Sequence, residues 1–219
     1  MKPSIDALLF DVGRVIIDID SKRVHRRWAE LSGVPVEQIA ARILARVAGQ
    51  TPFERHERGE ISDSAFFAHL RSELEVELTD AQFLEGWNAI FIGEMPGIRR
   101  VLSLVRDRLP LYAFSNTNKA HHAHWAISFG EVLGQFRKVY VSHEIGARKP
   151  EIEAFQLVLA DMGIAPERVL FFDDVAENVA AARACGLNAA QVASAAEVEA
   201  ALREANLAGP STSSAAPRG

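Results

Sequence analysis

The chain has little of what marks several specialised classes of protein. Its 219 residues include one cysteine, Cys185, so an internal disulfide cannot form, and we expect this thiol to act as a small apolar packing group. No apolar run approaches the ~20 residues that a membrane-spanning helix needs. The first apolar run is broken by Asp11 and is too short for a secretory signal. We therefore expect a cytoplasmic protein without membrane contacts.

Positive charge is also scarce. The 24 Lys and Arg residues are outnumbered by 29 Asp and Glu residues, which gives a formal net charge of −5, and the basic residues are scattered along the chain. Nucleic acid is therefore not an expected partner, because binding its backbone normally needs a basic patch. Large apolar residues are missing from 209–219, which is rich in Ser, Ala and Pro. We expect a disordered tail at 208–219.

The second half of the chain alternates between strand and helix patterns. Short apolar runs predict five strands, at Ala7–Phe10, Leu111–Phe114, Val139–Val141, Val169–Phe172 and Ala189–Val192. Helical spacing of apolar residues occurs at 98–108, 119–129, 151–162, 177–185 and 197–205. Continuous apolar runs are typical of parallel strands that are covered on both faces. The pattern predicts an α/β fold with a doubly wound, parallel, five-stranded (Rossmann-like) sheet.

Between the first strand and residue 95 the patterns are helical only. Five helices are predicted, at 21–31, 37–47, 51–57, 62–73 and 79–89, and Thr79 with Gln82 forms a capping-box pair at the start of the last. Because this insertion leaves the sheet directly after the first strand, we expect an all-helical cap over the carboxyl ends of the strands. A helical bundle packed elsewhere is the alternative. The predicted domains are a core of 1–17 and 96–207 and a cap of 18–95.

Large aromatic residues are expected to build the interior of this cap, and one or two of them are candidates to line the pocket. They are Trp28, Phe66, Phe67, Trp87 and Phe91.

Polar residues follow four of the five predicted strands. They are Asp11, then Ser115 with Asn116, then Lys149, and finally Asp173 with Asp174. Open α/β sheets bind their ligands in the crevice at the carboxyl ends of the strands, so we expect these side chains to converge. Carboxylates, an ammonium group, a hydroxyl and an amide together indicate a site for phosphate and a metal ion.

The segments around these residues resemble the four motifs of the haloacid dehalogenase superfamily in order and spacing. They are Phe10-Asp11-Val12-Gly13-Arg14-Val15, Ser115-Asn116, Lys149-Pro150 and Phe172-Asp173-Asp174. The resemblance covers Asp6 to Ala193. Asp18-Ile19-Asp20, the run from His56 to Ser62, Ser115 to Asn118 and Phe171 to Asp174 are similar to the bacterial α-D-glucose-1-phosphate phosphatases. This resemblance implies a helical cap and a sugar phosphate substrate.

The resemblance implies that Asp11 is the nucleophile and carries a transient aspartyl phosphate. Its implied cofactor is Mg²⁺, a hard cation that prefers oxygen ligands. The implied ligands are Asp11, the carbonyl of Gly13, and Asp173, with Asp174 as a direct or water-mediated ligand. Asn178, one helical turn later, is expected to orient Asp174.

The remaining motifs are expected to bind the phosphoryl group. Ser115 and Asn116 would donate hydrogen bonds to its oxygens, helped by backbone N–H groups where the next helix begins. Lys149 would balance the negative charge of the carboxylates and the phosphate. Phosphoryl transfer depends chiefly on such positioning and neutralisation.

One position departs from the family pattern. Most phosphatases of the superfamily have a second aspartate two residues after the nucleophile, which protonates the leaving oxygen, whereas this chain has Gly13. An anomeric oxygen needs little protonation because the ring oxygen withdraws charge from it, so Gly13 favours a sugar 1-phosphate. The glucose-1-phosphate phosphatases also have glycine there. Asp18, Asp20 or a cap residue such as His56 is the candidate to replace the missing acid.

Two groups of residues leave a choice between function and structure. His56, Glu57 and Arg58 are candidates for cap contacts to the substrate or for closing the lid, or else they form a solvated helix end. His121, His122 and His124 do not share one helical face, so we do not expect them to bind a metal together.

Two other functions fit the motifs less well. A metal-independent 2-haloacid dehalogenase would leave the acidic pair Asp173 and Asp174 unused. A non-catalytic phospholigand-binding protein would explain Gly13. The expected partner is a small phosphorylated molecule, and the sequence does not indicate which one or the oligomeric state.

Overall fold

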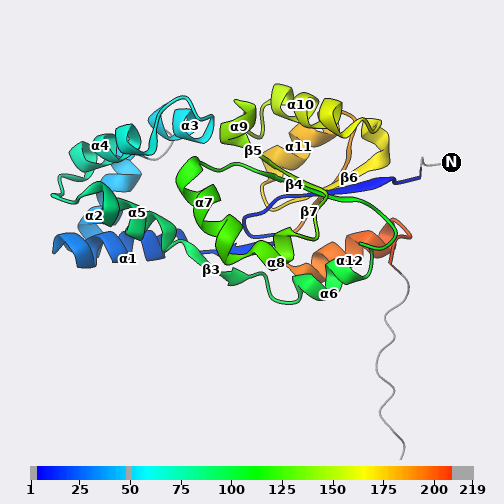
Figure 1. Ribbon diagram of the computed structural model, residues 1–219, viewed down its shortest axis with the longest axis horizontal. Helices are drawn as coiled ribbons and strands as arrows, with labels where there is room; N and C mark the ends of the chain where they lie inside the picture. The colour runs from blue at the N-terminus through cyan, green and yellow to red at the C-terminus, as the bar shows by residue number, and fades with distance from the viewer. Residues whose placement is uncertain (1–3, 48–50, 209–219) are drawn as a thin grey trace, which may run out of the picture.

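The computed structural model describes residues 4–47 and 51–208, which form a parallel sheet with helices on both faces and a helical insertion at one end (Figure 1). The sheet has five strands in the order β5-β4-β1-β6-β7. All of its neighbouring strands are parallel. The strands are β1 (Ala7–Phe10), β4 (Leu111–Ser115), β5 (Lys138–Val141), β6 (Val169–Asp173) and β7 (Asn188–Gln191). The predicted doubly wound α/β fold is confirmed.

Alternation along the central strand explains why both faces are covered. Leu8 and Phe10 point into one apolar cluster, where they meet α6 (Ile98–Ser103), α7 (Lys119–Ser128), α8 (Gly130–Leu133) and α12 (Ala195–Glu204). Ala7 and Leu9 point into the other, with α10 (Ile152–Met162) and α11 (Ala176–Ala184). Two shorter helices, α9 (Ser142–Ile145) and the 3-10 turn η2 (Pro166–Arg168), complete this part. The predicted packing role of Cys185 fits its place beside the second cluster.

The insertion contains helices that form an apolar cluster of their own. They are α1 (Ser21–Ser32), α2 (Val36–Arg42), the π-helix η1 (Ile43–Val47), α3 (Thr51–Glu57), α4 (Asp63–Leu74) and α5 (Asp80–Asn88). Trp28, Phe66 and Phe83 are fully buried in this cluster. The predicted capping box of Thr79 and Gln82 is present at the start of α5. We call this helical group the cap.

A two-stranded antiparallel ribbon, absent from the sequence-based prediction, connects the two parts. It pairs β2 (Ile17–Ile19) with β3 (Phe91–Glu94). Phe91 was expected in the cap interior, but it packs against the core cluster and stacks on His124. That expectation was wrong because the ribbon, rather than a helix, positions residue 91. We propose that the ribbon marks the two ends of the inserted cap, at residues 18 and 95.

Two further predictions concern the membrane and the end of the chain. Among the described helices, none combines the length and apolarity that crossing a membrane requires. The predicted tail begins with Ala208, which is buried, and its other residues, 209–219, lie outside the described residues.

Candidate active site

A cavity of about 360 Å³ lies where the carboxyl ends of the strands face the cap. From the core, the polar residues that line it include Asp11, Gly13, Ser115, Asn116, Lys149 and Asp174, which we call the core wall. From the inserted region, it is lined by Phe53, Glu57, Trp87 and Ile90, which we call the cap wall, and by Ile19 and Phe91 of the β2–β3 ribbon. The structure thus brings together the residues that sequence reasoning placed at the strand ends.

Lys149 connects two of the carboxylates beneath the cavity. Its Nζ lies 2.7 Å from Asp11 Oδ1 and 2.7 Å from Asp173 Oδ2, and the residue is only 1% exposed. Burial by itself would lower the pKa of Lys149, but the two carboxylates outweigh that effect and raise it. The side chain is therefore a buried ammonium ion that Asp11 and Asp173 share, and it offsets part of their negative charge.

Asp173 is fully buried and is held in place from three sides. Its Oδ1 accepts a hydrogen bond from the Val175 backbone N–H at 2.9 Å, and both its oxygens accept from Asn178 Nδ2 at 3.0 and 3.1 Å. Asn178 was expected to orient Asp174 instead. The amide reaches Asp173 because that carboxylate points back toward the helix that carries Asn178, whereas Asp174 lines the cavity.

Three carboxylates are arranged so that one cation could bind all of them. One oxygen from each of Asp11, Asp173 and Asp174 lies within 4.8 Å of the others. With Lys149, their formal charge is −3 + 1 = −2 when all are ionised, which a divalent cation would balance. Burial, followed by the neighbouring Asp173, raises the pKa of Asp174, and burial raises that of Asp11. Crowded carboxylate oxygens fit a hard cation such as Mg²⁺.

Arg14 is a cavity residue that the sequence-based prediction missed. Its backbone has a left-handed φ of 59°, which is uncommon for a residue with a side chain and is found where a site imposes it. Hydrogen bonds from Arg14 N to Ile17 O (2.7 Å) and from Ile17 N to Val12 O (2.8 Å) hold this turn. The guanidinium lies 3.8 Å from Asp174 and lines the cavity.

The side chain of Asn116 forms hydrogen bonds within the protein, whereas it was predicted to bind the phosphoryl group. Its Nδ2 donates to the Lys149 carbonyl at 2.7 Å, and its Oδ1 accepts from the Lys149 N–H at 2.8 Å. It therefore positions the lysine loop, and its amide is not free to bind a phosphoryl group in this arrangement. The hydroxyl of Ser115, which is buried at the cavity, makes a long contact of 3.4 Å with the Asn116 carbonyl.

The structure does not bring His56 and Arg58 to the cavity. The ring of His56 stacks on Phe66 at 4.2 Å, and its Nε2 lies 2.7 Å from Asp63 Oδ1. Arg58 forms an ion pair with Glu151 of the core. The His56 contacts lie within the cap and the Arg58 pair joins cap to core, and neither residue lines the cavity.

The two aspartates considered as replacement acids also lie elsewhere. Asp18 is in the β2 strand and Asp20 caps the α1 helix, where its side chain accepts from Lys22 N. Neither of them lines the cavity.

Glu57, which lies between His56 and Arg58, is the acidic residue of the cap wall. It is buried, and its Oε2 accepts a hydrogen bond from Arg148 Nε at 2.6 Å. Burial is the largest cause of a raised pKa at this carboxyl, and Arg148 opposes it in part. Sequence reasoning named Glu57 with His56 and Arg58 as a candidate cap contact, but it did not single out Glu57 as the acid.

The three histidines of α7 have different main partners, although His121 and His124 both contact Phe91. His121 is buried against Trp87, with its ring 4.6 Å from the indole and its Nε2 3.1 Å from the Trp87 carbonyl. Burial lowers the pKa of His121 to about 3. His124 stacks on Phe91, and His122 faces Glu144.

The chain is similar to known proteins over most of its length. Residues 5–186 match the family model described as haloacid dehalogenase-like hydrolase. The D-ribitol-5-phosphate phosphatase of Bacteroides thetaiotaomicron is 28% identical over 182 residues, which are 80% of this chain and 85% of that protein. The phosphorylated carbohydrates phosphatase of Thermotoga maritima is 25% identical over 186 residues, covering 84% of this chain and 82% of that one.

A solved structure with ligands has the same fold. It is a HAD family enzyme of Bacteroides thetaiotaomicron in complex with magnesium and inorganic phosphate, with a TM-score of 0.72 at 27% identity. The match covers 86% of this chain and 94% of that structure.

Proposed function

The chain belongs to the haloacid dehalogenase-like hydrolases, and within that family we propose that it is a Mg²⁺-dependent phosphatase of phosphorylated sugars. The observation that carries this proposal is the buried group of Asp11, Lys149 and Asp173 beside Asp174, at the base of one cavity. Such a group can accept a phosphoryl dianion only with further positive charge, which supports a divalent cation. The magnesium and phosphate bound in the similar HAD enzyme support the same cofactor.

We propose that Asp11 attacks phosphorus and forms an aspartyl phosphate that water then hydrolyses. Mg²⁺ held by Asp11, Asp173, Asp174 and the Gly13 carbonyl would offset the negative charge of the phosphoryl oxygens. Lys149 keeps one Asp11 oxygen fixed at 2.7 Å, so that the other oxygen can face the substrate. The Ser115 hydroxyl, with backbone N–H groups near it, would bind the phosphoryl oxygens. An acidic pair beside the nucleophile has no use in metal-independent dehalogenation, which argues against that alternative.

The cap wall offers a replacement for the acid that is missing at Gly13. Glu57 lines the same cavity as Asp11 but comes from the opposite side, where the leaving group of a bound substrate would lie. Its raised pKa, caused mainly by burial, makes the carboxyl a better proton donor near neutral pH than an exposed glutamate. We propose that Glu57 protonates the leaving oxygen.

The substrate class follows from the relatives and from the cavity. The two curated relatives are named for phosphatase activity on ribitol 5-phosphate and on phosphorylated carbohydrates. A cavity of about 360 Å³ is near the lower end of the range of about 300–1,000 Å³ seen for small-molecule sites, which favours a small substrate. Glycine at position 13 leaves the core wall without an acid, so Glu57 would be the single proton donor, which favours a leaving group that needs little protonation, such as an anomeric oxygen. We therefore propose a sugar 1-phosphate, such as glucose 1-phosphate, as the preferred substrate.

A phosphate-release screen over sugar 1-, 5- and 6-phosphates with Mg²⁺ tests this proposal. We expect turnover that EDTA abolishes, with the highest kcat/KM for a 1-phosphate. Higher kcat/KM for 5- or 6-phosphates would contradict the leaving-group argument and leave the phosphatase assignment intact. Halide release from a 2-haloacid without metal, and no phosphate release from any sugar phosphate, would overturn the assignment itself.

A further inference from the structure

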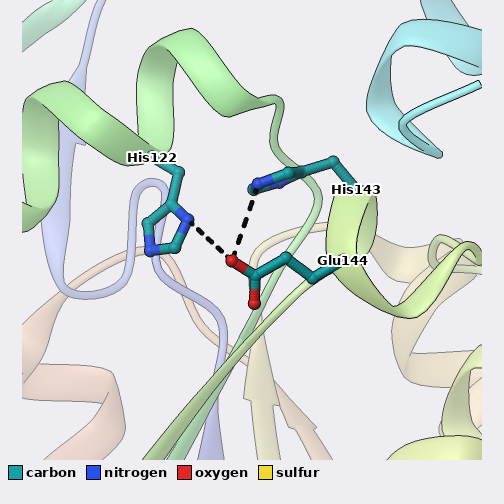
Figure 2. A group of neighbouring side chains, drawn as sticks. All are labelled: His122, His143 and Glu144. Atoms are coloured by element: carbon teal, nitrogen blue, oxygen red, sulfur yellow. Dashed lines mark ion pairs between the residues drawn. The ribbon is translucent and has the colours of Figure 1, made fainter. Parts of the chain in front are cut away.

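A second group of metal-binding side chains lies on the core, outside the cavity. It consists of His122 in the first turn of α7 and of His143 and Glu144 in α9 (Figure 2). Figure 2 shows both imidazole rings directed at the same carboxylate oxygen. His122 Nδ1 lies 3.5 Å from Glu144 Oε1, and His143 Nε2 lies 3.9 Å from it. We call these residues the His-His-Glu group.

The spacing of these atoms suits a transition metal ion. Tetrahedral Zn²⁺ has metal–nitrogen and metal–oxygen distances of about 2.0–2.2 Å, which places its ligand atoms about 3.3–3.6 Å apart. The observed separations of 3.5 and 3.9 Å are close to these values, and all three ligand atoms lie within 4.8 Å of one another. Small side-chain rotations are enough to close the difference, since Glu144 is largely exposed.

The chemistry of the group selects the kind of metal. Imidazole nitrogen suits Zn²⁺, Co²⁺, Ni²⁺ and Cu²⁺, whereas Mg²⁺ prefers oxygen ligands only. We propose that His122, His143 and Glu144 form a second metal site, specific for a zinc-type ion and separate from the carboxylate site.

The position of the group gives the site a structural consequence. His122 follows the loop of Ser115 and Asn116, and α9 precedes the loop that carries Lys149. Gly59 of the cap also packs closely against the backbone of His143. A Cβ added to Gly59 would lie only 2.4 Å from the His143 carbonyl oxygen. A metal bound here would therefore fix α7 to α9 behind the core wall, beside a contact between core and cap. We expect it to stabilise the folded protein by an amount that rises with the logarithm of the metal concentration above the Kd.

Metal titration of the whole protein tests the proposal. The protein is stripped of metal and saturated with Mg²⁺ to fill the carboxylate site, and is then titrated with Zn²⁺ by calorimetry and with Co²⁺ by visible absorption. We expect one equivalent of Zn²⁺ to bind, a Co²⁺ spectrum of the four-coordinate type, and a melting temperature that rises with Zn²⁺. Absence of a bound equivalent in the presence of Mg²⁺ would overturn the proposal.

Substitutions distinguish this site from other places where Zn²⁺ could bind. His122→Ala and the milder Glu144→Gln are expected to weaken Zn²⁺ binding by about 10-fold or more, judged against the 10–100-fold that loss of even an outer partner costs. His124→Ala, on the same helix but outside the group, is the matched control and should bind Zn²⁺ like the unchanged protein. Unaltered binding in both variants, with circular dichroism confirming their fold, would assign the ion to another site and refute the proposal.

Discussion

The core wall and the cap wall of the cavity differ in the chemistry of their side chains. The core wall is charged, and its ions are fixed by short contacts such as those of Lys149 with Asp11 and Asp173. The cap wall is mainly apolar, with Phe53, Trp87 and Ile90 around one carboxyl. Charge fixed in this way suits the transfer of a phosphoryl group, which varies little between substrates. Apolar surface with a single acidic group suits recognition of the leaving group. We therefore assign phosphoryl transfer to the core wall and substrate specificity to the cap wall.

The strongest test of the core wall is removal of the nucleophile. We expect Asp11→Asn to lower kcat by about 10⁴-fold or more for every substrate, because no covalent intermediate can form without this carboxylate. The measurement is phosphate release with several sugar phosphates and an aryl phosphate. Asp6→Asn, which removes an exposed carboxylate paired with Arg168, is the control and should retain activity. Residual turnover within about 10-fold of the unchanged enzyme would show that another group attacks phosphorus.

Loss of the buried ammonium group is the next largest effect expected. Lys149→Met leaves Asp11 and Asp173 without their shared cation, so kcat should fall by about 10²- to 10³-fold, independently of the leaving group. The same change should destabilise the Mg²⁺-free protein by about 3–5 kcal/mol, measured by urea unfolding, because breaking a buried pair leaves uncompensated charge.

Lys138 provides a matched control for this substitution. It pairs with the exposed Asp161, so Lys138→Met should change stability by less than about 1 kcal/mol and leave turnover intact. A loss of activity from Lys149→Met that differs between sugar phosphates would mean that the core wall also recognises the leaving group.

The core wall could be predicted because of how parallel strands end. Asp11, Ser115 and Asp173 each stand at the carboxyl end of an apolar run, and parallel pairing brings such ends to one edge of the sheet. The sequence did not reveal which hydrogen-bond partners the polar side chains have. Asn116 bonds the Lys149 backbone and Asn178 bonds Asp173, and these choices depend on loop paths that no local pattern encodes.

The cap wall could be predicted only as a segment. Successive residues on a helix point about 100° apart, so shifting the facing of α3 by one residue exchanges His56 for Glu57 at the cavity. That facing is set by contacts distant in the sequence, such as the pair of Glu57 with Arg148. The ribbon of β2 and β3 was missed for the same reason, since residues more than 70 positions apart complete it, as in the pairing of Ile17 with Glu94.

Substitution of Glu57 in the cap wall should lower activity to a different extent for different leaving groups, whereas substitutions in the core wall should affect all substrates alike. We expect Glu57→Gln to lower kcat/KM by about 10²-fold for a sugar 6-phosphate, whose oxygen needs a proton, and by less than about 10-fold for an aryl phosphate. This ratio reports the formation of the phosphoenzyme, the step in which the leaving group departs. An equal loss with all substrates would contradict the role of proton donor and indicate that Glu57 only positions Arg148.

Controls for Glu57 are available within the cap. Glu54→Gln alters the same helix and another partner of Arg148 without touching the cavity, and it should have a small effect on all substrates. Asp18→Asn and His56→Ala remove two of the other candidate acids, and their effects on the leaving-group ratio should also be small.

His121, where the two walls meet, gives the smallest effect and the one that depends on pH. Burial lowers its pKa to about 3, so the folded protein does not protonate this ring at pH 5, whereas the unfolded chain takes up the proton near pH 6.5. Because the unfolded state binds the proton first, acid destabilises the fold, by about 2 kcal/mol from this residue between pH 7 and pH 5. Urea unfolding at both pH values should show this loss, and His121→Gln, which cannot titrate, should show less of it by that amount. Other histidines with lowered pKa, such as His56 and His143, are common to both proteins, so the difference isolates His121. Equal acid sensitivity in the two proteins would mean that the contact of His121 with Trp87 opens before the ring is protonated, and that core and cap separate there more easily than their packing suggests.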